Sequence, residues 1–515
     1  MTDRLRAQPG PILFGLMIAF GVGVLVRLIP AVPGPLSPGD GGLIVVMVDD
    51  LRQAGFVMPE ITTYNAADIP YVYPPLGLYL AALLGQLLGL PSLDAVRMVA
   101  ALLALATLGA FAALAFRLLP AAAALGAVFV YALMPHAYDP LVAGGGVTRG
   151  AGVLLTILAM VVAAAPVSTS VRRAAGIGLL LGLAALSHPQ TALYGAAATT
   201  VLVFGSTGVR VGFTRMLVAA AVSILVVLPW LGLMASEHGL SSVLAAGHRW
   251  DPVLGLVRLF GLTFSGSAFT DLFLVVGVLG LVVEVLARRW TLPLLLGCLL
   301  FAGEADFIGA VPWSLLGGAA IGFVLAAVRP VVPTGDRALR IGVGLVALFL
   351  ALLSSLGSVV DDTSRLQRVS ADQVAAMEWV RDNTEPGTRY IVATTVYWGG
   401  DEISEWFPAV AERQSVATVQ GSEWLGEDGY QAQLERHRGV FHCTRSTDQC
   451  MAEWAADEGL ADAALFIPKG QVNGPLSAAD CCPALRELVQ GSDRYEVVYD
   501  GPGATIAIPA ELARD

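Results

Sequence analysis

The stretch AVPGPLSPGDGGLIVVMVDDLRQAGFVMPEITTYNAADIPYVYPPLGLY (residues 31–79) is a polar interruption in an otherwise apolar N-terminal region. It directly follows the first long apolar segment, and it carries five acidic residues: Asp40, Asp49, Asp50, Glu60 and Asp68. Charged side chains are costly inside a bilayer. We therefore expect this stretch to form a large loop at one membrane face.

The composition predicts a polytopic α-helical membrane protein. Of the 515 residues, 56% are hydrophobic and only 14% are charged, whereas soluble domains carry about 25% charged residues. Lys469 is the only lysine, and no basic face of useful size exists, so we exclude a nucleic-acid partner. The first apolar run, from Pro11 to about Leu28, is longer than a signal-peptide core, which favours a retained membrane helix over a cleaved signal.

Eleven apolar segments have the character of membrane helices. They are 11–30, 96–116, 119–136, 150–166, 174–188, 190–206, 215–235, 268–287, 290–303, 308–328 and 340–359. A further apolar segment, 72–90, begins with Pro74 and Pro75. We expect it to be re-entrant or interfacial, because a proline pair suits a break in the chain.

Arginine placement predicts the orientation, because short cytoplasmic loops are enriched in Lys and Arg. If segment 72–90 does not cross, the N-terminus and the arginine-bearing loops share one side. These arginines are Arg4, Arg6, Arg117, Arg172, Arg173, Arg210, Arg215, Arg288, Arg289, Arg329, Arg337 and Arg340. We therefore expect a cytoplasmic N-terminus in the cell membrane, with loops 31–95, 137–149, 236–267 and 304–307 and the C-terminal region on the outer side.

Residues 360–515 are more polar, and we expect a separate extracytoplasmic α/β domain there, after a membrane domain of residues 1–359. SADQVAAMEWVRDN predicts a helix ending near Asn383, and RYIVATT, DAALFIP, YEVVYD and ATIAIP predict strands, the last two a hairpin around GPG. Cys443, Cys450, Cys481 and Cys482 are disulfide candidates in an oxidising compartment, with three possible pairings. The alternative is free or zinc-binding thiols, with His437 and His442 nearby.

The order of these segments resembles the GT-C superfamily of membrane glycosyltransferases, which includes the aminoarabinose transferases and the protein mannosyltransferases. Asp40 precedes a helical stretch to Gly55, then VMP and YVYPPLGLYLAALLGQLLGL. GLLLGLAALSHPQTALY is similar to a family segment with a His-Pro at an outer helix end, and LVAGGGVTRGAG resembles an outer-loop element of one prokaryotic subgroup. MEWVRDNTEPGTRYIV and EWFPAVAERQSVATVQGSEW resemble the outer domain of many polyprenyl-phosphate-dependent members.

The resemblance implies a sugar transfer from a polyprenyl-phosphate donor to an acceptor that the sequence does not identify (a glycan, a protein or a lipid). Two departures matter. Many members have an acid pair at the loop start, but Asp40 stands among Gly39, Gly41 and Gly42. The signature WWDYG is absent, which argues against transfer of a whole oligosaccharide.

Two residues carry the expected chemistry. We interpret Asp40 as the general base, chiefly because of the resemblance; the alternative is a helix cap on 41–54. We interpret Arg149, after a glycine run, as a phosphate ligand, since its guanidinium forks onto phosphate oxygens; the alternative is a snorkelling side chain at a turn.

Further substrate-binding candidates are His188, Asp49, Asp50, Arg249, Trp250 and Glu304. Simpler interpretations exist for several: a helix-end His, a solvated helix face for the two aspartates, and an interfacial anchor for Trp250. Asp49 and Asp50 could hold a divalent cation or orient the acceptor, and we assign no cofactor. A transporter or lipid flippase with an accessory outer domain is the alternative function, although no internal repeat is visible; a non-catalytic scaffold is a third.

Overall fold

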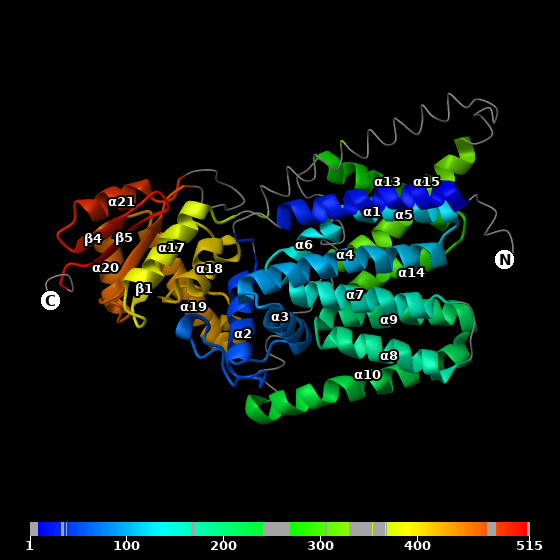
Figure 1. The fold of residues 1–515 in the computed structure, drawn as a ribbon, viewed down its shortest axis with the longest axis horizontal. Helices are drawn as coiled ribbons and strands as arrows, with labels where there is room; N and C mark the ends of the chain where they lie inside the picture. Colours follow the sequence, from blue (N-terminus) through cyan, green and yellow to red (C-terminus); the bar gives the residue numbers. More distant parts are fainter. Residues whose placement is uncertain are drawn as a thin grey trace.

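The computed structural model describes residues 9–31, 36–37, 39–165, 170–239, 268–303, 306–328, 353, 366, 368–470 and 480–511. It contains a bundle of long helices and, at one end of that bundle, an α/β region formed by the C-terminal part of the chain (Figure 1). The first described helix, Pro9–Ala31, begins at the opposite end of the bundle (Figure 1).

The bundle is built mainly from helices near the predicted apolar segments. They are α1 (Pro9–Ala31), α4 (Ser92–Leu118), α5 (Ala121–Leu133), α7 (Gly146–Ala163), α8 (Val171–Ala185), α9 (Pro189–Thr207), α10 (Val209–Glu237), α13 (Ala268–Leu286), α14 (Thr291–Gly297) and α15 (Ala310–Val328). Within the described residues, five helices are long and apolar enough to cross a membrane. There are six if Ala121–Leu133 and Pro135–Val142, which are bent relative to each other, form one span. The predicted multi-span helical membrane protein is confirmed; the count of eleven stays a prediction, and segment 340–359 lies almost wholly outside the described residues.

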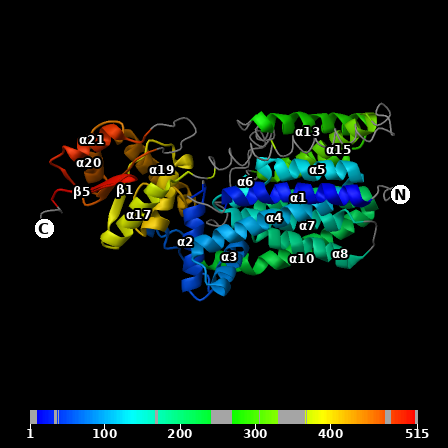
Figure 2. The ribbon, with the colours of Figure 1, turned by 45° about the horizontal axis from the view of Figure 1, so that its top comes forward.

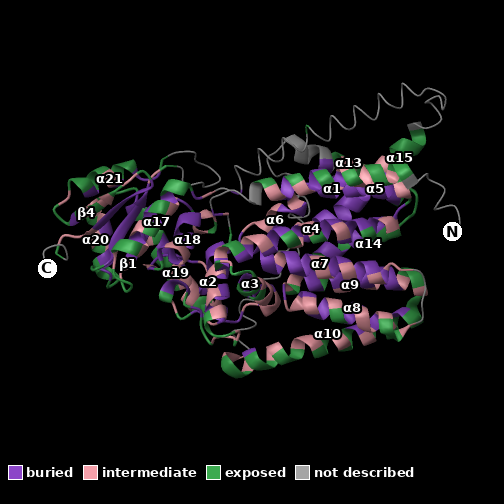
Figure 3. Cartoon of the chain, viewed as in Figure 1, coloured by how far each residue is buried: buried purple, intermediate pink, exposed green. Residues whose placement is uncertain are grey.

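Small residues let the bundle helices approach closely, as is usual in membranes. A Cβ atom added to Gly318 of α15 would stand 2.4 Å from the carbonyl oxygen of Ala123 on α5. Conversely, apolar side chains point outward along α10, where Leu225 is 67% exposed (Figure 3). Tight interior packing and an apolar exterior are the arrangement that lipid surroundings favour.

The predicted loop folds into two helices at the end of the bundle, α2 (Gly41–Gln53) and α3 (Pro75–Leu88). They lie between the bundle and the α/β region (Figure 2). Helix α3 begins at Pro75 and is followed by Gly89, whose φ of +64° suits glycine. Its 14 residues span about 21 Å at 1.5 Å per residue, less than the roughly 30 Å of a bilayer core. Whether this segment is re-entrant or interfacial stays a prediction.

The C-terminal region is a five-stranded sheet with helices around it. The strands, in the order β2-β1-β3-β5-β4, are β2 (Gln414–Ser415), β1 (Arg389–Val392), β3 (Ala464–Pro468), β5 (Ala504–Pro509) and β4 (Tyr495–Asp500). Strand β1 pairs in parallel with β2 and β3, whereas β5 is antiparallel to β3 and β4. The helices are α17 (Ala371–Asn383), α18 (Glu402–Ala411), α19 (Gly426–Cys443), α20 (Asp448–Asp457) and α21 (Pro483–Gln490). The predicted helix ending at Asn383, the strands and the final hairpin are confirmed.

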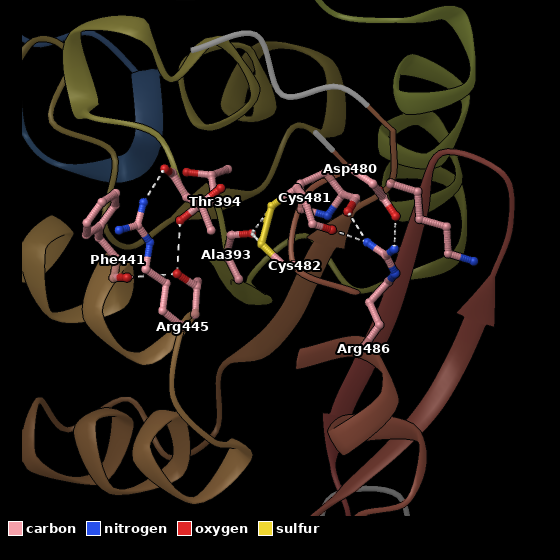
Figure 4. The surroundings of a disulfide bond; sticks show 12 residues. Ala393, Thr394, Phe441, Arg445, Asp480, Cys481, Cys482 and Arg486 are labelled. Carbon is pink, nitrogen blue, oxygen red and sulfur yellow. Dashed lines mark hydrogen bonds and ion pairs between the residues drawn. A yellow bond between two sulfur atoms is a disulfide. The ribbon is translucent and has the colours of Figure 1, made fainter. Parts of the chain in front are cut away.

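Four cysteines of this region are paired in two disulfides. Cys443, the last residue of α19, is joined to Cys450 of α20, and the adjacent Cys481 and Cys482 are joined to each other. Figure 4 shows the second pair against the carbonyl group of Ala393, whose oxygen lies 3.6 and 3.4 Å from the two sulfur atoms. The sequence had left three pairings open, and this is the pairing that the structure contains.

Candidate active site

The site begins where two glycine-containing loops meet. Gly39, after α1, pairs with Gly144, before α7, in an isolated parallel bridge. Gly39 has a φ of +91°, and a Cβ atom on Gly144 would stand 2.4 Å from the backbone nitrogen of Gly41. Side chains at these positions would push the two segments apart, so the glycines bring the next charged residue of each segment together.

Those charged residues are Asp40 and Arg149. Arg149 lies in the first turn of α7, and its Nη2 atom stands 3.4 Å from Oδ2 of Asp40. Its Nη1 atom donates a hydrogen bond of 3.1 Å to the carbonyl oxygen of Pro140. The side chains remain partly accessible, with exposed fractions of 29% for Asp40 and 18% for Arg149. The structure thus brings together the two residues on which the predicted chemistry depends.

The C-terminal region contributes a third member that the sequence analysis missed. Gln420, from the turn between β2 and the 3₁₀ helix Ser422–Leu425, donates a hydrogen bond of 3.0 Å from Nε2 to Oδ1 of Asp40. Oδ2 of Asp40 therefore contacts Arg149 of the bundle, and Oδ1 accepts a hydrogen bond from Gln420 of the α/β region. The stretch that contains Gln420 was recognised as family-like, but no local pattern marks this glutamine.

Glu405 of α18 holds the helix that starts at Asp40. Its Oε1 atom accepts hydrogen bonds from the backbone N–H groups of Gly42, at 2.7 Å, and Leu43, at 3.2 Å. Asp40 occupies the N-cap position but makes no side-chain capping bond. The alternative interpretation of Asp40 as the helix cap is therefore confirmed for its position, but the side chain makes no capping bond. Glu405 binds these amides, which leaves the Asp40 carboxylate directed to Arg149 and Gln420.

Glycine is needed for this contact between α2 and α18. A Cβ atom on Gly41 would stand 2.1 Å from the ring of Trp406, and one on Gly42 would stand 2.6 Å from the carbonyl oxygen of Glu405. Trp406 also donates from Nε1 to the carbonyl oxygen of Ser37, at 2.8 Å. The glycines flanking Asp40 thus admit a helix of the C-terminal region.

Two further carboxyl groups stand near Asp40 with perturbed protonation. Burial, together with the nearby Asp40 carboxylate, raises the pKa of Glu405 well above its usual value. The same two causes raise the pKa of Glu423 to about 7. The Oε2 atom of Glu405 is buried without a hydrogen-bond partner in the described part of the chain, as suits a protonated acid better than a carboxylate. Burial beside Asp40 therefore favours the neutral forms of Glu405 and Glu423.

Asp49 and Asp50 lie elsewhere and have other partners. They follow Asp40 by nine and ten residues, so about 14 Å of helix separates them from it. Asp49 accepts hydrogen bonds from Gln53, at 2.7 Å, and Ser92, at 2.9 Å. Asp50 is buried, not on a solvated face, and accepts from the hydroxyl groups of Thr62 and Thr63, both at 2.6 Å. These contacts tie α2 to its neighbours.

His188 occupies the N-cap position of α9, and its ring lies edge-on against Phe307. A Cβ atom on Gly152 would stand 2.7 Å from that of His188, so the histidine packs beside α7 one turn beyond Arg149. Its Nδ1 atom is buried without a hydrogen-bond partner among the described residues. Arg249, Trp250 and Glu304 lie outside the described residues. Within that described part, no cluster of three His, Cys, Asp or Glu side chains is arranged to hold a metal ion.

Solved structures share this fold. ArnT from Cupriavidus metallidurans, bound to undecaprenyl phosphate, matches with a TM-score of 0.59 at 15% identity, over 97% of this chain and 98% of that one. The oligosaccharyltransferase AglB from Archaeoglobus fulgidus, in complex with an inhibitory peptide and a dolichol-phosphate, matches with a TM-score of 0.56 at 13% identity, over 88% of this chain and 69% of that one. The bundle, the polar loop after α1 and the appended α/β region therefore define a membrane protein of the GT-C fold.

The family match agrees with this class. Residues 72–232 match the family described as dolichyl-phosphate-mannose-protein mannosyltransferase. The predicted resemblance to the GT-C superfamily of polyprenyl-phosphate-dependent glycosyltransferases is thereby confirmed. A comparison with curated proteins finds no match.

Proposed function

We propose that this protein is an inverting glycosyltransferase that moves a sugar from a polyprenyl-phosphate donor to a hydroxyl acceptor at the outer face of the membrane. The observation that carries the proposal is the pairing of Asp40 with Arg149, 3.4 Å apart, where two loops meet at the end of the bundle. A base for the acceptor and a cation for the donor are the two groups that this reaction requires.

Arg149 is the proposed phosphate ligand. A guanidinium group binds phosphate oxygens through two parallel hydrogen bonds, and the N-terminus of α7, where Arg149 lies, favours an anion. A bound donor phosphate would compete with Asp40 for this arginine. Donor binding would thereby release the Asp40 carboxylate to act on the acceptor.

Asp40 is the proposed general base. The acceptor oxygen forms a bond to the anomeric carbon of the sugar while the bond from that carbon to the phosphate oxygen breaks. The acceptor proton passes to Asp40, and the electron pair of the broken bond leaves with the polyprenyl phosphate. Arg149 stabilises the charge that develops on this leaving group.

Gln420 and Glu405 are proposed as positioning residues. Gln420 fixes one oxygen of Asp40, and Glu405 fixes the first backbone amides after it. Because both come from the C-terminal region, that region would complete the active site. A general base must be held within hydrogen-bonding reach of the proton that it accepts.

The test is transfer of radiolabelled sugar in membranes that contain the protein, with a panel of polyprenyl-phosphate sugars as donors. We expect Asp40→Asn to abolish transfer while the protein remains folded and inserted. Unchanged transfer by this variant would refute the proposal. Lipid movement that persists in the variant, in the absence of any sugar transfer by the wild type, would identify a flippase.

The orientation is part of the proposal. With the N-terminus in the cytoplasm, Asp40 and the C-terminal region face outward. The two disulfides support this side, since disulfides persist in extracytoplasmic compartments. Protease added to intact cells should cleave the C-terminal region; protection of that region until the cells are opened would overturn the assignment.

A further inference from the structure

Three aromatic side chains meet on the C-terminal region, at the turn that leads into α18. Tyr397 and Trp398 are adjacent in the sequence, and their ring centroids are 5.8 Å apart. Tyr430 of α19 meets the ring of Trp398 edge-on, with 6.1 Å between the centroids. Tyr397 is 67% exposed, more than any other large hydrophobic side chain in the described part of the C-terminal region. We call these three residues the aromatic surface.

The turn holds the aromatic surface in a fixed position. The 3₁₀ helix Trp398–Gly400 is closed by a hydrogen bond of 2.9 Å from the backbone N–H of Gly400 to the carbonyl oxygen of Tyr397. The next residue, Asp401, is buried and accepts hydrogen bonds from two hydroxyl groups, at 2.5 and 2.8 Å. The ring of Tyr397 lies close to Gly399, where an added Cβ atom would stand 3.4 Å from its Cε1 atom. A ligand would therefore meet rings that are already ordered, which lowers the entropic cost of binding.

Exposed rings of this kind suit the face of a sugar. One face of a sugar ring presents C–H groups, which the electron-rich face of an aromatic ring attracts, while the hydroxyl groups project around the edge. Tyrosine and tryptophan offer a large rigid contact area with a polar end. The Nε1 atom of Trp398 is buried and has no hydrogen-bond partner among the described residues. The fold therefore leaves this donor unused.

The charges beside the aromatic surface are mixed. Glu427 is exposed and precedes Tyr430 by three residues on α19, so the two lie on neighbouring positions of that helix surface. Arg445 donates a hydrogen bond of 3.4 Å to the carbonyl oxygen of Thr395, two residues before Tyr397. Such a rim offers acceptors and donors to sugar hydroxyl groups. It offers no uniformly basic field to an anionic lipid surface or a polyanion, so a neutral glycan is the ligand that it fits.

The aromatic surface adjoins both segments of the C-terminal region that reach the proposed active site. Trp398 precedes Glu405 by seven residues, a path of at most about 25 Å, and Glu405 binds the first backbone amides after Asp40. Tyr430 lies near the start of α19 and follows Gln420, which binds Asp40 itself, by ten residues. A glycan chain of several sugars covers such a distance.

We propose that the aromatic surface binds a neutral glycan, with one sugar ring stacked on Tyr397 and the next against Trp398, and that this glycan is the acceptor. The second part rests on the proposed function; the binding of the glycan does not. The acceptor would then be a glycan and not a protein or a lipid. Its growing end would extend from the aromatic surface to Asp40.

Binding of a panel of neutral oligosaccharides to the full chain in phosphatidylcholine nanodiscs, measured by thermophoresis without any donor, tests the proposal. We expect binding by the wild type and a loss of affinity of about tenfold in Tyr397→Ala, as for removal of one stacked ring. Tyr397→Phe keeps the ring and should bind normally. Tyr499→Ala is the matched control, because it removes a partly exposed tyrosine, paired with Trp379 at 4.7 Å, from the far edge strand β4. It should also bind normally.

Three results would overturn the proposal. They are binding of no oligosaccharide in the panel, equal losses in Tyr397→Ala and Tyr499→Ala, and tighter binding of an acidic oligosaccharide such as oligogalacturonate. Iodination by an external peroxidase, which does not enter lipid, adds a readout of access. Tyr397 should be iodinated in sugar-free nanodiscs and protected by the bound glycan. Protection without any sugar would show that the lipid surface covers Tyr397, and would refute glycan binding.

The experiment separates this inference from the proposed function. Asp40→Asn should bind the glycan as the wild type does, because Asp40 is not part of the aromatic surface. If Tyr397→Ala binds normally while Asp40→Asn abolishes sugar transfer, the aromatic surface fails and the glycosyltransferase stands. If Tyr397→Ala loses binding while Asp40→Asn transfers sugar normally, the glycan-binding surface stands and the proposed base fails.

Discussion

Glu405 provides the sharpest test of how the C-terminal region holds the proposed active site. Its Oε1 atom accepts two hydrogen bonds from the start of α2, and burial beside Asp40 raises its pKa. Glu405→Ala removes both bonds and leaves two backbone N–H groups without this acceptor. At about 1 kcal/mol for each bond, plus the loss of a buried side chain, we expect a destabilisation of about 2–4 kcal/mol.

Glu405→Gln is the matched control, because glutamine keeps an acceptor oxygen and resembles the protonated acid. The neutral form of Glu405 is favoured in the folded protein, so its contribution to stability is present at low pH and is lost as pH rises through the raised pKa. Glutamine has no such loss. We therefore expect Glu405→Gln to match the wild type near pH 5 and to equal or exceed its stability above neutrality.

The chain carries its own reporter for this experiment. Cys298 is a free, buried thiol in the bundle, so a thiol-reactive dye reports unfolding when it gains access. Glu405→Ala should lower the unfolding temperature by several degrees and reduce sugar transfer. If Glu405→Gln were as damaging as Glu405→Ala at pH 6, the carboxylate would have to be charged, and the protonation argument would be refuted.

Four further outcomes are expected. Arg149→Lys keeps the positive charge but loses the paired hydrogen bonds of a guanidinium group to the donor phosphate. Sugar transfer should therefore fall at least tenfold, with a raised KM for the donor. An unchanged KM would count against Arg149 as the donor-phosphate ligand. Gln420→Ala removes one hydrogen bond to a carboxylate and should lower kcat about tenfold with KM little changed; a change in KM alone would point to binding instead. Because burial raises the pKa of Glu423 to about 7, Glu423→Gln should be as stable as the wild type near pH 4 and more stable than it above pH 7. The gain above pH 7 should be about 1–2 kcal/mol, since the side chain keeps some exposure to solvent. A thermal-unfolding series across pH checks this, and a difference at pH 4 would contradict it. Replacing Cys443 and Cys450 by Ser opens a loop with a sequence separation of 7 and should cost about 2–3 kcal/mol; a similar unfolding temperature with and without reductant in the wild type would contradict this.

Local sequence patterns predicted the fold well because apolar length and periodicity determine most of its helices and strands. The helix ending at Asn383 and the hairpin of β4 and β5 follow from such patterns. Segment 72–90 also follows its sequence, since Pro75 begins a short helix that Gly89 ends. Local patterns do not determine how these elements pack against one another. The contact between α2 and α18 was therefore not predicted from the sequence.

The proposed site was predictable in its bundle half only. Asp40 could be chosen chiefly because of the resemblance to a known family, and Arg149 because it follows a glycine run. Gln420 and Glu405 meet the start of α2 across 380 and 363 residues of sequence, and no spacing rule reaches that far. The side chains of Asp49 and Asp50 depended on the exact rotation of α2, which directs them to Ser92 and to Thr62 and Thr63.

The slot formed by Gly41 and Gly42 has a practical consequence for anyone who wishes to shorten this protein. Trp406 fills that slot, and Tyr64 of the loop donates to the carbonyl oxygen of Glu405 at 2.7 Å. A chain cut after the last membrane helix would expose the slot to water. The first backbone N–H groups of α2 would also lose the acceptor that Glu405 provides. Neither fragment would then be a minimal enzyme, and the two halves should regain activity only when they are expressed together.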